Sequence, residues 1–312
     1  MRKVIFDTDP GQDDAVAILA ALGSPDEIEV LGISAVAGNI PLHHTVNNAL
    51  RLVELAGRPD IPVYAGADRP FAHRLVTAEH VHGVTGLDGP DLPQPVTKPR
   101  EGHSVDFIID TVRRLPDKTV TIAALGPLTN IALAFLKAPD IIERLQGVVL
   151  MGGAYFEVGN ITPTAEFNIY VDPDAAGIVF RSGADITVLP LDVTHQMHST
   201  PPRIEAFRQI GNKAGAAVAA MLTFSETYDL KKYGWNGAPL HDPCVTAFLL
   251  RPDLFEGRRV NVEVETGSAL TRGMTVVDFW RVTDRQPNAF YVRSGDADRF
   301  FALLTERVAR LP

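Results

Sequence analysis

The sequence predicts an α/β fold, with a mostly parallel central sheet flanked by helices, in a single domain that covers residues 1–312. Short apolar runs rich in β-branched residues alternate with segments of helical spacing, which is typical of a parallel sheet covered on both faces. With 312 residues and 46% hydrophobic content, the chain can bury a large core. No internal repeat, low-complexity segment or linker indicates a second domain.

Five apolar runs are predicted strands, and helical segments lie between them. The predicted strands cover residues 4–7, 28–36, 120–124, 148–151 and 186–189. The predicted helices cover residues 13–22, 45–55, 105–113, 128–136 and 173–181. Later in the chain we expect helices at 215–228 and 243–250, strands at 260–264 and 275–280, and a closing helix at 297–310.

Residues 66–102 break this alternation, because Gly, Pro, His and Asp dominate the segment. A connection of that length inside a compact domain is usually functional. We therefore expect this long loop to contribute to a site.

The composition excludes several classes of partner. A formal net charge of −9 argues against a nucleic-acid or anionic-membrane surface, which requires clustered Lys and Arg. A single cysteine, Cys244, excludes an intrachain disulfide. The apolar run at residues 4–6 is too short for a signal peptide, and the runs at 214–222 and 245–250 are too short to span a membrane. We expect a cytoplasmic protein without nucleic-acid or membrane partners.

An acidic cluster follows the first predicted strand. Its members are Asp7, Asp9, Asp13 and Asp14. Parallel α/β sheets bind ligands at the carboxyl ends of their strands, and Pro10-Gly11 supplies a turn that lets the acids converge. Four neighbouring carboxylates repel one another, and a bound cation relieves that repulsion. Oxygen ligands suit Ca²⁺ or Mg²⁺ better than Zn²⁺. Helix capping explains one or two of these acids but not four.

Further motifs come after the predicted strands. They are Ala37-Gly38-Asn39, His82-Gly83-Val84-Thr85-Gly86-Leu87, Leu125-Gly126-Pro127-Leu128-Thr129-Asn130, Met151-Gly152-Gly153 with Asn160, Ala165-Glu166-Phe167-Asn168, and Pro239-Leu240-His241-Asp242-Pro243. Together with the acidic cluster, they resemble the motifs of the inosine-uridine-type nucleoside hydrolases from roughly residue 4 to residue 243. The resemblance implies the Rossmann-like topology of that family and hydrolysis of the N-glycosidic bond of ribonucleosides.

The same resemblance implies the metal and the catalytic base. Asp9, Asp14, Asp242 and the main-chain carbonyl of Leu125 would hold Ca²⁺. Asp13 would be the general base that acts on the attacking water. Because breaking C1′–N spreads positive charge over the sugar, this site has to position a water and stabilise an oxocarbenium-like ribose.

The ribose would be held by side chains that the resemblance also supplies. They are Asn39, Asn160, Glu166 and Asn168, with Met151 and Phe167 as further substrate contacts. Amides and carboxylates suit the vicinal hydroxyls of a sugar. Taken alone, Asn160 in Val158-Gly159-Asn160 is typical of a turn.

Two histidines are candidates for helping the base to leave. His241, next to Asp242, can hold a proton near neutral pH and give it to the base, and His82 on the long loop is the second candidate. The combination of His82 and His241 resembles that of family members that prefer pyrimidine nucleosides. Uridine and cytidine are therefore the favoured substrates, and purine nucleosides remain an alternative. The other seven histidines are predicted to be surface or core residues; they are His43, His44, His73, His80, His103, His195 and His198.

The helix before His241 carries candidate base-reading residues. Thr223, Thr227 and Lys231 recur every four residues and therefore share one face, and Tyr228 follows Thr227. These side chains could hydrogen-bond and stack on a pyrimidine. A solvated helix face explains the same spacing equally well.

Two other functions compete with this interpretation. Asp7-Thr8-Asp9 also fits the first motif of a Mg²⁺-dependent haloacid dehalogenase-type phosphohydrolase, although no lysine and acidic pair for phosphate follows convincingly. A non-catalytic nucleoside-binding protein would need only the ribose contacts, and it would need neither Asp13 nor His241. For the assembly, the resemblance suggests a homodimer or a homotetramer.

Overall fold

A large sheet forms the centre of the molecule in the computed structural model, which describes residues 1–227 and 234–312 with their side chains. Its strands are β1 (Arg2–Thr8), β2 (Ile28–Ala35), β3 (Val63–Ala65), β4 (Val120–Ala124), β5 (Gly147–Met151), β6 (Ile186–Leu189), β9 (Phe255–Val264), β10 (Thr275–Asp278) and β11 (Ala289–Gly295). Within the described residues they form one nine-stranded sheet in the order β10-β9-β11-β6-β5-β4-β1-β2-β3.

Most neighbouring strands of this sheet are parallel. The pairs from β3 through β2, β1, β4, β5 and β6 to β11 are all parallel, whereas β9 runs antiparallel to both β11 and β10. The mostly parallel α/β fold predicted from the sequence is confirmed, in one domain. The carboxyl ends of the central strands therefore meet at one edge of the sheet, where loops can assemble a site.

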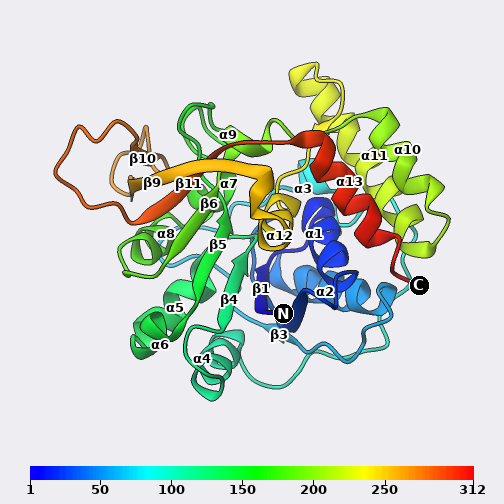
Figure 1. Cartoon of the computed structure of the whole chain (residues 1–312), viewed down its shortest axis with the longest axis horizontal. Coiled ribbons are helices and arrows are strands. Elements are labelled where there is room, and N and C mark those ends of the chain that lie inside the picture. Colours follow the sequence, from blue (N-terminus) through cyan, green and yellow to red (C-terminus); the bar gives the residue numbers. More distant parts are fainter.

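Helices cover both faces of the sheet (Figure 1). They are α1 (Gln12–Leu22), α2 (Leu42–Leu55), α3 (Glu79–His82), α4 (Ser104–Arg114), α5 (Thr129–Lys137), α6 (Asp140–Arg144), α7 (Phe167–Val171), α8 (Pro173–Phe180), α9 (Leu191–Thr194), α10 (Pro201–Gln209), α11 (Lys213–Tyr233), α12 (Pro243–Leu250) and α13 (Ala297–Val308), with a 3₁₀ turn at Pro252–Leu254. Side chains of α4, α5, α6 and α8 share one core cluster, and those of α1, α2 and α10 to α13 share the other.

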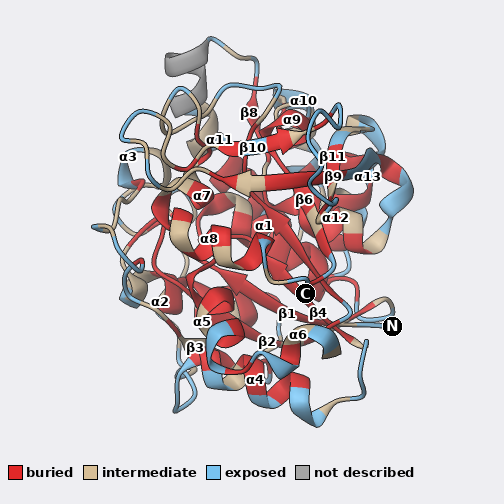
Figure 2. Cartoon of the chain, turned by 90° about the vertical axis from the view of Figure 1, so that its left-hand side faces the viewer, coloured by how far each residue is buried: buried red, intermediate tan, exposed pale blue. Residues whose placement is uncertain are grey.

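The alternation of side chains along β1 explains the two cores. Val4 and Phe6 are fully buried in one cluster, while Ile5 between them is fully buried in the other. Successive side chains of a strand point to opposite faces, so a strand covered on both faces reads as a continuous apolar run. Figure 2 shows the resulting band of buried residues through the sheet, with exposed residues mainly on the outer helices and loops.

Several boundaries differ from the prediction, and some elements were missed. Helix α2 begins at Leu42, three residues before the predicted start at residue 45, and β10 ends at Asp278. Strand β11 was not predicted, yet it joins β6 to β9. Its apolar start at Ala289 gives way to the polar residues Arg293 and Ser294, which hides the strand pattern.

A short second sheet lies beside the main one. Strands β7 (His198–Ser199) and β8 (Ala238–Pro239) pair antiparallel, with His198 opposite Pro239. This pairing holds the segment that follows α11 against the segment that follows α9. It therefore places β8, just before α12, in the upper part of the molecule in Figure 2, beside α9 and α10.

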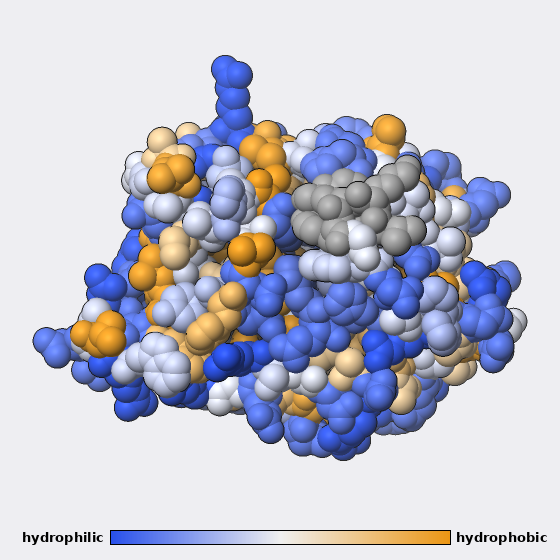
Figure 3. Space-filling model, turned by 90° about the horizontal axis from the view of Figure 1, so that it is seen from above, coloured by the Kyte–Doolittle hydropathy of each residue, from blue (hydrophilic) through white to orange (hydrophobic). Residues whose placement is uncertain are grey.

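The long loop at 66–102 contains one described helix, α3, at the same end of the molecule. Figure 3 shows this end from above, where hydrophobic side chains form separate groups on a largely hydrophilic surface. Within the described residues, no helix combines the length and the apolar character needed to cross a lipid bilayer.

Candidate active site

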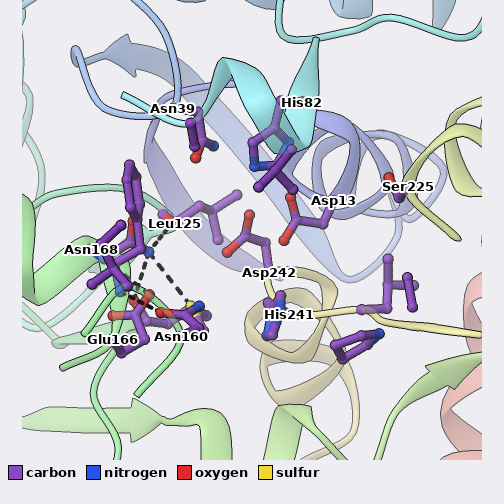
Figure 4. A pocket seen from close by; sticks show the side chains of 18 of the residues that line it. Asp13, Asn39, His82, Leu125, Asn160, Glu166, Asn168, Ser225, His241 and Asp242 are labelled. Carbon is purple, nitrogen blue, oxygen red and sulfur yellow. Dashed lines mark hydrogen bonds between the residues drawn. The ribbon is translucent and has the colours of Figure 1, made fainter. Parts of the chain in front are cut away.

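A pocket lies at the carboxyl ends of the central strands and collects most of the predicted site residues (Figure 4). Its lining residues are Asp13, Asn39, Ala78, His80, Val81, His82, Leu125, Met151, Asn160, Ile161, Glu166, Phe167, Asn168, His195, Leu222, Ser225, Trp235, Ala238, Pro239, Leu240, His241 and Asp242. In Figure 4 Asp13 and Asp242 lie in the middle, Asn160, Glu166 and Asn168 lie on one side, and Ser225 lies on the other.

Two helix N-termini bring three of the acids together. Asp13 and Asp14 are in the first turn of α1, and Asp242 is the N-cap residue of α12. Oxygen atoms of these three carboxylates all lie within 4.8 Å of one another. The positive ends of the two helix dipoles favour negative charge at this point, but they cannot neutralise three carboxylates. The group could therefore hold a metal ion.

Asp9 lies beside this group and is fully buried. Its Oδ2 accepts a hydrogen bond of 2.6 Å from the backbone N–H of Asn39, while its Oδ1 has no hydrogen-bond partner among the described residues. Backbone encloses the carboxylate so closely that a Cβ at Gly38 or Gly126 would overlap it. A buried carboxylate oxygen without a donor is costly, so a cation fits this position.

Burial and repulsion change the acid strengths of the group. Desolvation and neighbouring carboxylates raise the pKa values of Asp9 and Asp242 well above the usual value of 3.8. Burial and the charge of Asp13 raise the pKa of Asp14 to about 7, although Thr8 and the backbone of Gly11 donate hydrogen bonds to it. The oxygen-only donor set and the unpartnered Oδ1 of Asp9 together fit a hard divalent cation.

The carbonyl oxygen of Leu125 faces the same site. It accepts a 2.7 Å hydrogen bond from Nδ2 of Asn168, and that amide also donates to the carbonyl of Met151. A carbonyl oxygen has two lone pairs, so this bond leaves Leu125 able to accept a second partner. The same bonds hold Asn168 in place against the ends of β4 and β5.

Asp7 differs from Asp9 and Asp14, because no neighbouring carboxylate contributes to its raised pKa. It is fully buried within the sheet, where its Oδ1 accepts hydrogen bonds from Ser34 and Asn130. Burial raises the pKa of Asp7 to about 7. Asp7 follows Phe6 on β1, whose alternate residues point to opposite faces, and the sequence cluster therefore divides between the pocket and the interior.

Three of the predicted ribose contacts, Asn160, Glu166 and Asn168, lie together on one side of the pocket, and Asn39 lies apart from them (Figure 4). Glu166 caps α7, where its Oε1 accepts from the N–H of Asn168 and its Oε2 accepts from the N–H groups of Gly153 and Ile169. Burial nevertheless raises the pKa of Glu166 to about 7. The Oδ1 of Asn160 accepts from the N–H of Phe167. These bonds hold the polar groups in fixed orientations before any substrate binds.

The two candidate histidines enter the pocket from different elements. Nδ1 of His241 lies 2.7 Å from the hydroxyl of Thr194, and Nδ1 of His82 lies 2.6 Å from Oε1 of Gln12. Desolvation lowers the pKa of His241 to about 4, while the negative charge of Asp13 opposes that shift. Desolvation also lowers the pKa of His82. Burial in the protein therefore favours the neutral form of both rings at neutral pH.

Of the base-reading residues predicted on α11, the two that the structure describes, Thr223 and Thr227, do not line the pocket. Thr223 and Thr227 are exposed, and their hydroxyls donate to backbone carbonyls of their own helix. The side chains of Tyr228 and Lys231 lie outside the described residues. The described lining residues from this helix are Leu222 and Ser225.

Sequence reasoning missed two histidines and a tryptophan. His80 and His195 were predicted to be surface or core residues, but both line the pocket. The ring centroid of His195 lies 5.1 Å from that of Trp235 and 5.8 Å from that of His241. Nδ1 of His195 lies 3.1 Å from a carboxylate oxygen of Glu157. No local spacing indicates this group, because β7–β8 pairing brings its members together.

We expect the metal-free protein to lose stability as the pH rises from about 6.5 to 8. Asp7, Asp14 and Glu166 have pKa values of about 7 in the folded chain, against 3.8 or 4.5 in an unfolded one. The folded state therefore binds more protons in this range, and deprotonation destabilises it. Buried histidines act in the opposite direction, but only below their ordinary pKa of 6.5.

The melting temperature in a chelator, measured across this pH range, checks that prediction. Adding Ca²⁺ should recover more stability at pH 8 than at pH 6.5, because more carboxylates are then ionised. A melting temperature that rises with pH in the chelator would contradict the burial of these acids.

Comparisons with known proteins agree with this geometry. The chain matches the family model of the inosine-uridine preferring nucleoside hydrolases over residues 4–302. An uncharacterized protein of Schizosaccharomyces pombe is 54% identical over 310 residues, which cover 99% of this chain and 100% of the relative. The pyrimidine-specific ribonucleoside hydrolase RihA of Klebsiella pneumoniae is 44% identical over 307 residues, which cover 98% of each chain.

Solved structures extend the similarity to the fold. A purine-preferring ribonucleoside hydrolase from Gardnerella vaginalis superposes with a TM-score of 0.92 at 35% identity, and the match covers 99% of this chain and 98% of that one. The family match includes the Asp7-Thr8-Asp9 motif, so the phosphohydrolase and the purely binding protein considered above are set aside. The chain belongs to the inosine-uridine preferring nucleoside hydrolase family and is an N-glycosidase that acts on ribonucleosides.

Proposed function

We propose that the protein hydrolyses ribonucleosides to free base and ribose with Ca²⁺ held by Asp9, Asp14, Asp242 and the carbonyl of Leu125. The convergence of carboxylates within 4.8 Å of one another, beside the unpartnered Oδ1 of buried Asp9, is the observation that carries the metal assignment. Ca²⁺ accepts many oxygen ligands in flexible geometry, which suits a mixture of carboxylates and a carbonyl. When bound, the ion supplies positive charge that makes a nearby water more acidic and attracts the ribose hydroxyls.

Asp13 is the general base in this proposal. Its side chain is only partly buried, it lines the pocket, and no described residue hydrogen-bonds to it. Its carboxylate accepts the proton of a water whose oxygen forms a bond to C1′, while the electron pair of the C1′–N bond leaves with the base. Asn39, Asn160, Glu166 and Asn168, with Met151 and Phe167, surround the ribose and hold C1′ against that water.

His241 is the proposed acid that assists the departing base. His241→Ala should lower kcat on uridine by about 10²- to 10⁴-fold, because a pyrimidine anion leaves slowly without a proton. On p-nitrophenyl riboside the loss should be small, since nitrophenolate needs no proton to leave. Steady-state kinetics on both substrates measure the difference.

His198→Ala is the matched control for this test. The ring of His198 packs against Trp235, at 5.4 Å between centroids, in the same group of aromatic rings as His195 and His241, but His198 does not line the pocket. His198→Ala should lower kcat on both substrates only slightly and to the same extent. Equal losses on the two substrates in His241→Ala would indicate a structural role and remove His241 as the acid.

Uridine and cytidine are the proposed preferred substrates. The RihA relatives at 44–46% identity are named pyrimidine-specific, whereas the purine-preferring relative is 35% identical. Values of kcat/KM for uridine, cytidine, inosine and adenosine test this preference. Faster cleavage of inosine than of uridine would overturn the preference and leave the reaction intact.

The assembly and the location of the protein stay predictions of the sequence. We propose a cytoplasmic homodimer or homotetramer that acts on small nucleosides and has neither nucleic-acid nor membrane partners. Light scattering of the purified protein would distinguish the two assemblies from a monomer.

A further inference from the structure

Gln12 joins the first helix to the loop that carries His82. It is the first residue of α1, the whole residue is 1% exposed, and it does not line the pocket. Its Nε2 donates to the carbonyl of His82 at 2.9 Å and to the carbonyl of Asp88 at 3.1 Å. Its Oε1 lies 2.6 Å from Nδ1 of His82. Gln12 thus contacts both the backbone and the ring of His82.

These contacts fix the orientation of the Gln12 amide. Carbonyl oxygens can only accept hydrogen bonds, so the NH₂ group has to face the two carbonyls. The amide oxygen then faces Nδ1 of His82, and an amide oxygen can only accept. Turning the amide over would set its oxygen against two carbonyl oxygens. Nδ1 of His82 therefore has to carry the hydrogen in this bond.

The other ring nitrogen is left to the pocket. A neutral imidazole has one N–H, so Nε2 of a neutral His82 carries a lone pair. No described residue hydrogen-bonds to this nitrogen. The backbone of Gly11 packs against the Nδ1 side of the His82 ring, since a Cβ at Gly11 would lie 2.5 Å from Nδ1. In Figure 4 His82 and His241 lie on opposite sides of the acids, away from Glu166 and Asn160.

We propose that Gln12 is a positioning residue that fixes His82 as its Nδ1–H tautomer, so that Nε2 accepts a hydrogen bond from an N–H group of the bound base. The expected partners are N–H groups on the edge of a pyrimidine, namely N3–H of uridine or the exocyclic N4–H of cytidine. This inference rests on the proposed nucleoside hydrolysis and assigns His82 the role of an acceptor that reads the base.

A second amide anchors the same loop without touching the ring. Nδ2 of Asn48 donates to the carbonyl of Thr85 at 2.7 Å and to the carbonyl of Pro10 at 3.0 Å. Asn48 is buried on α2. Loss of Asn48 should loosen the loop, but Gln12 still contacts Nδ1 of His82 and still fixes its tautomer. Asn48→Ala is therefore the matched control for Gln12→Met, which removes the amide at similar side-chain length.

The spectroscopic test uses ¹⁵N-labelled full-length protein with Ca²⁺ at pH 8. Long-range ¹H–¹⁵N spectra of the histidine rings report which nitrogen carries the proton, and His82→Gln identifies the signals of His82. We expect a protonated Nδ1 and a bare Nε2 in the wild type and in Asn48→Ala, and a shift towards Nε2–H in Gln12→Met. A protonated Nε2 in the wild type would overturn the proposal, whatever substrate the protein cleaves.

The kinetic test compares uridine with 3-methyluridine, which lacks N3–H. One neutral hydrogen bond should favour uridine by up to about tenfold in kcat/KM, mainly through KM. Gln12→Met should reduce that preference, whereas Asn48→Ala should keep it. Equal preferences in all three proteins would overturn the acceptor role. Failure to cleave either nucleoside would instead refute the proposed function, while the spectra would still decide the tautomer.

Discussion

Asp13→Ala is expected to abolish most turnover while leaving the fold and calcium binding in place. Asp13 occupies the second position of α1, is only partly buried, and has no hydrogen-bond partner among the described residues, so its loss removes little structure. A general base contributes about 10²- to 10⁴-fold to the rate, and kcat on uridine should fall by that factor. Calorimetry with Ca²⁺ and a melting curve measure the two properties that should persist.

Asp298→Ala provides the matched control. Asp298 occupies the second position of α13, and its side chain is 95% exposed in a surface pair with Arg203. Like Asp13→Ala, Asp298→Ala removes an acid from the first turn of a helix, but this acid lies outside the pocket. The kcat of Asp298→Ala should therefore stay at the wild-type value. Wild-type kcat in Asp13→Ala would remove Asp13 from the mechanism. Lost calcium binding would instead make Asp13 a ligand, which its distance from Asp14 and Asp242 allows.

Asp9→Asn should stabilise the metal-free protein and at the same time abolish activity. The amide keeps an oxygen for the N–H of Asn39 and removes a charge that burial and Asp14 disfavour. A chelator-treated sample should therefore melt at a higher temperature than the wild type. Because the amide cannot replace the charge of the carboxylate, calcium affinity and kcat should fall together.

Asp7→Asn tests whether this effect belongs to the metal site. Asp7 is also fully buried, and its Oδ2 has no hydrogen-bond partner among the described residues. Ser34 and Asn130 donate to its Oδ1, however, and no neighbouring carboxylate contributes to its raised pKa. This variant should keep its affinity for Ca²⁺. The assignment of Asp9 would be wrong if Asp9→Asn retained calcium binding, or if it were less stable than the wild type in the chelator.

Residues whose role follows from the end of a strand were predictable. Asp9, Asn39 and Leu125 follow β1, β2 and β4, and the parallel sheet brings such positions to one edge. The order of the motifs then related them to a known family, and the structure gathers Asn39, Leu125 and Asp242 around one pocket. Asp7 shows the limit of this reasoning, because adjacency in the sequence does not reveal which face of the sheet a side chain occupies.

Residues that depend on orientation or on long-range pairing could not be predicted. A repeat of four indicates that Thr223 and Thr227 share a helix face, but only packing decides that Leu222 and Ser225 line the pocket. His195 meets Trp235 because β7 pairs with β8, which are two-residue strands without a sequence pattern. The bonds from Gln12 to the long loop depend in the same way on side-chain rotamers and on the path of the loop.

Release of ribose from uridine, with and without a calcium chelator, tests metal-assisted nucleoside hydrolysis most directly. A reducing-sugar assay follows the product, and the melting curve of each sample establishes that the protein is folded. We predict ribose release that the chelator abolishes and that added Ca²⁺ restores. Release that is unchanged in the chelator, or no release from folded and calcium-loaded protein, would contradict the proposed mechanism.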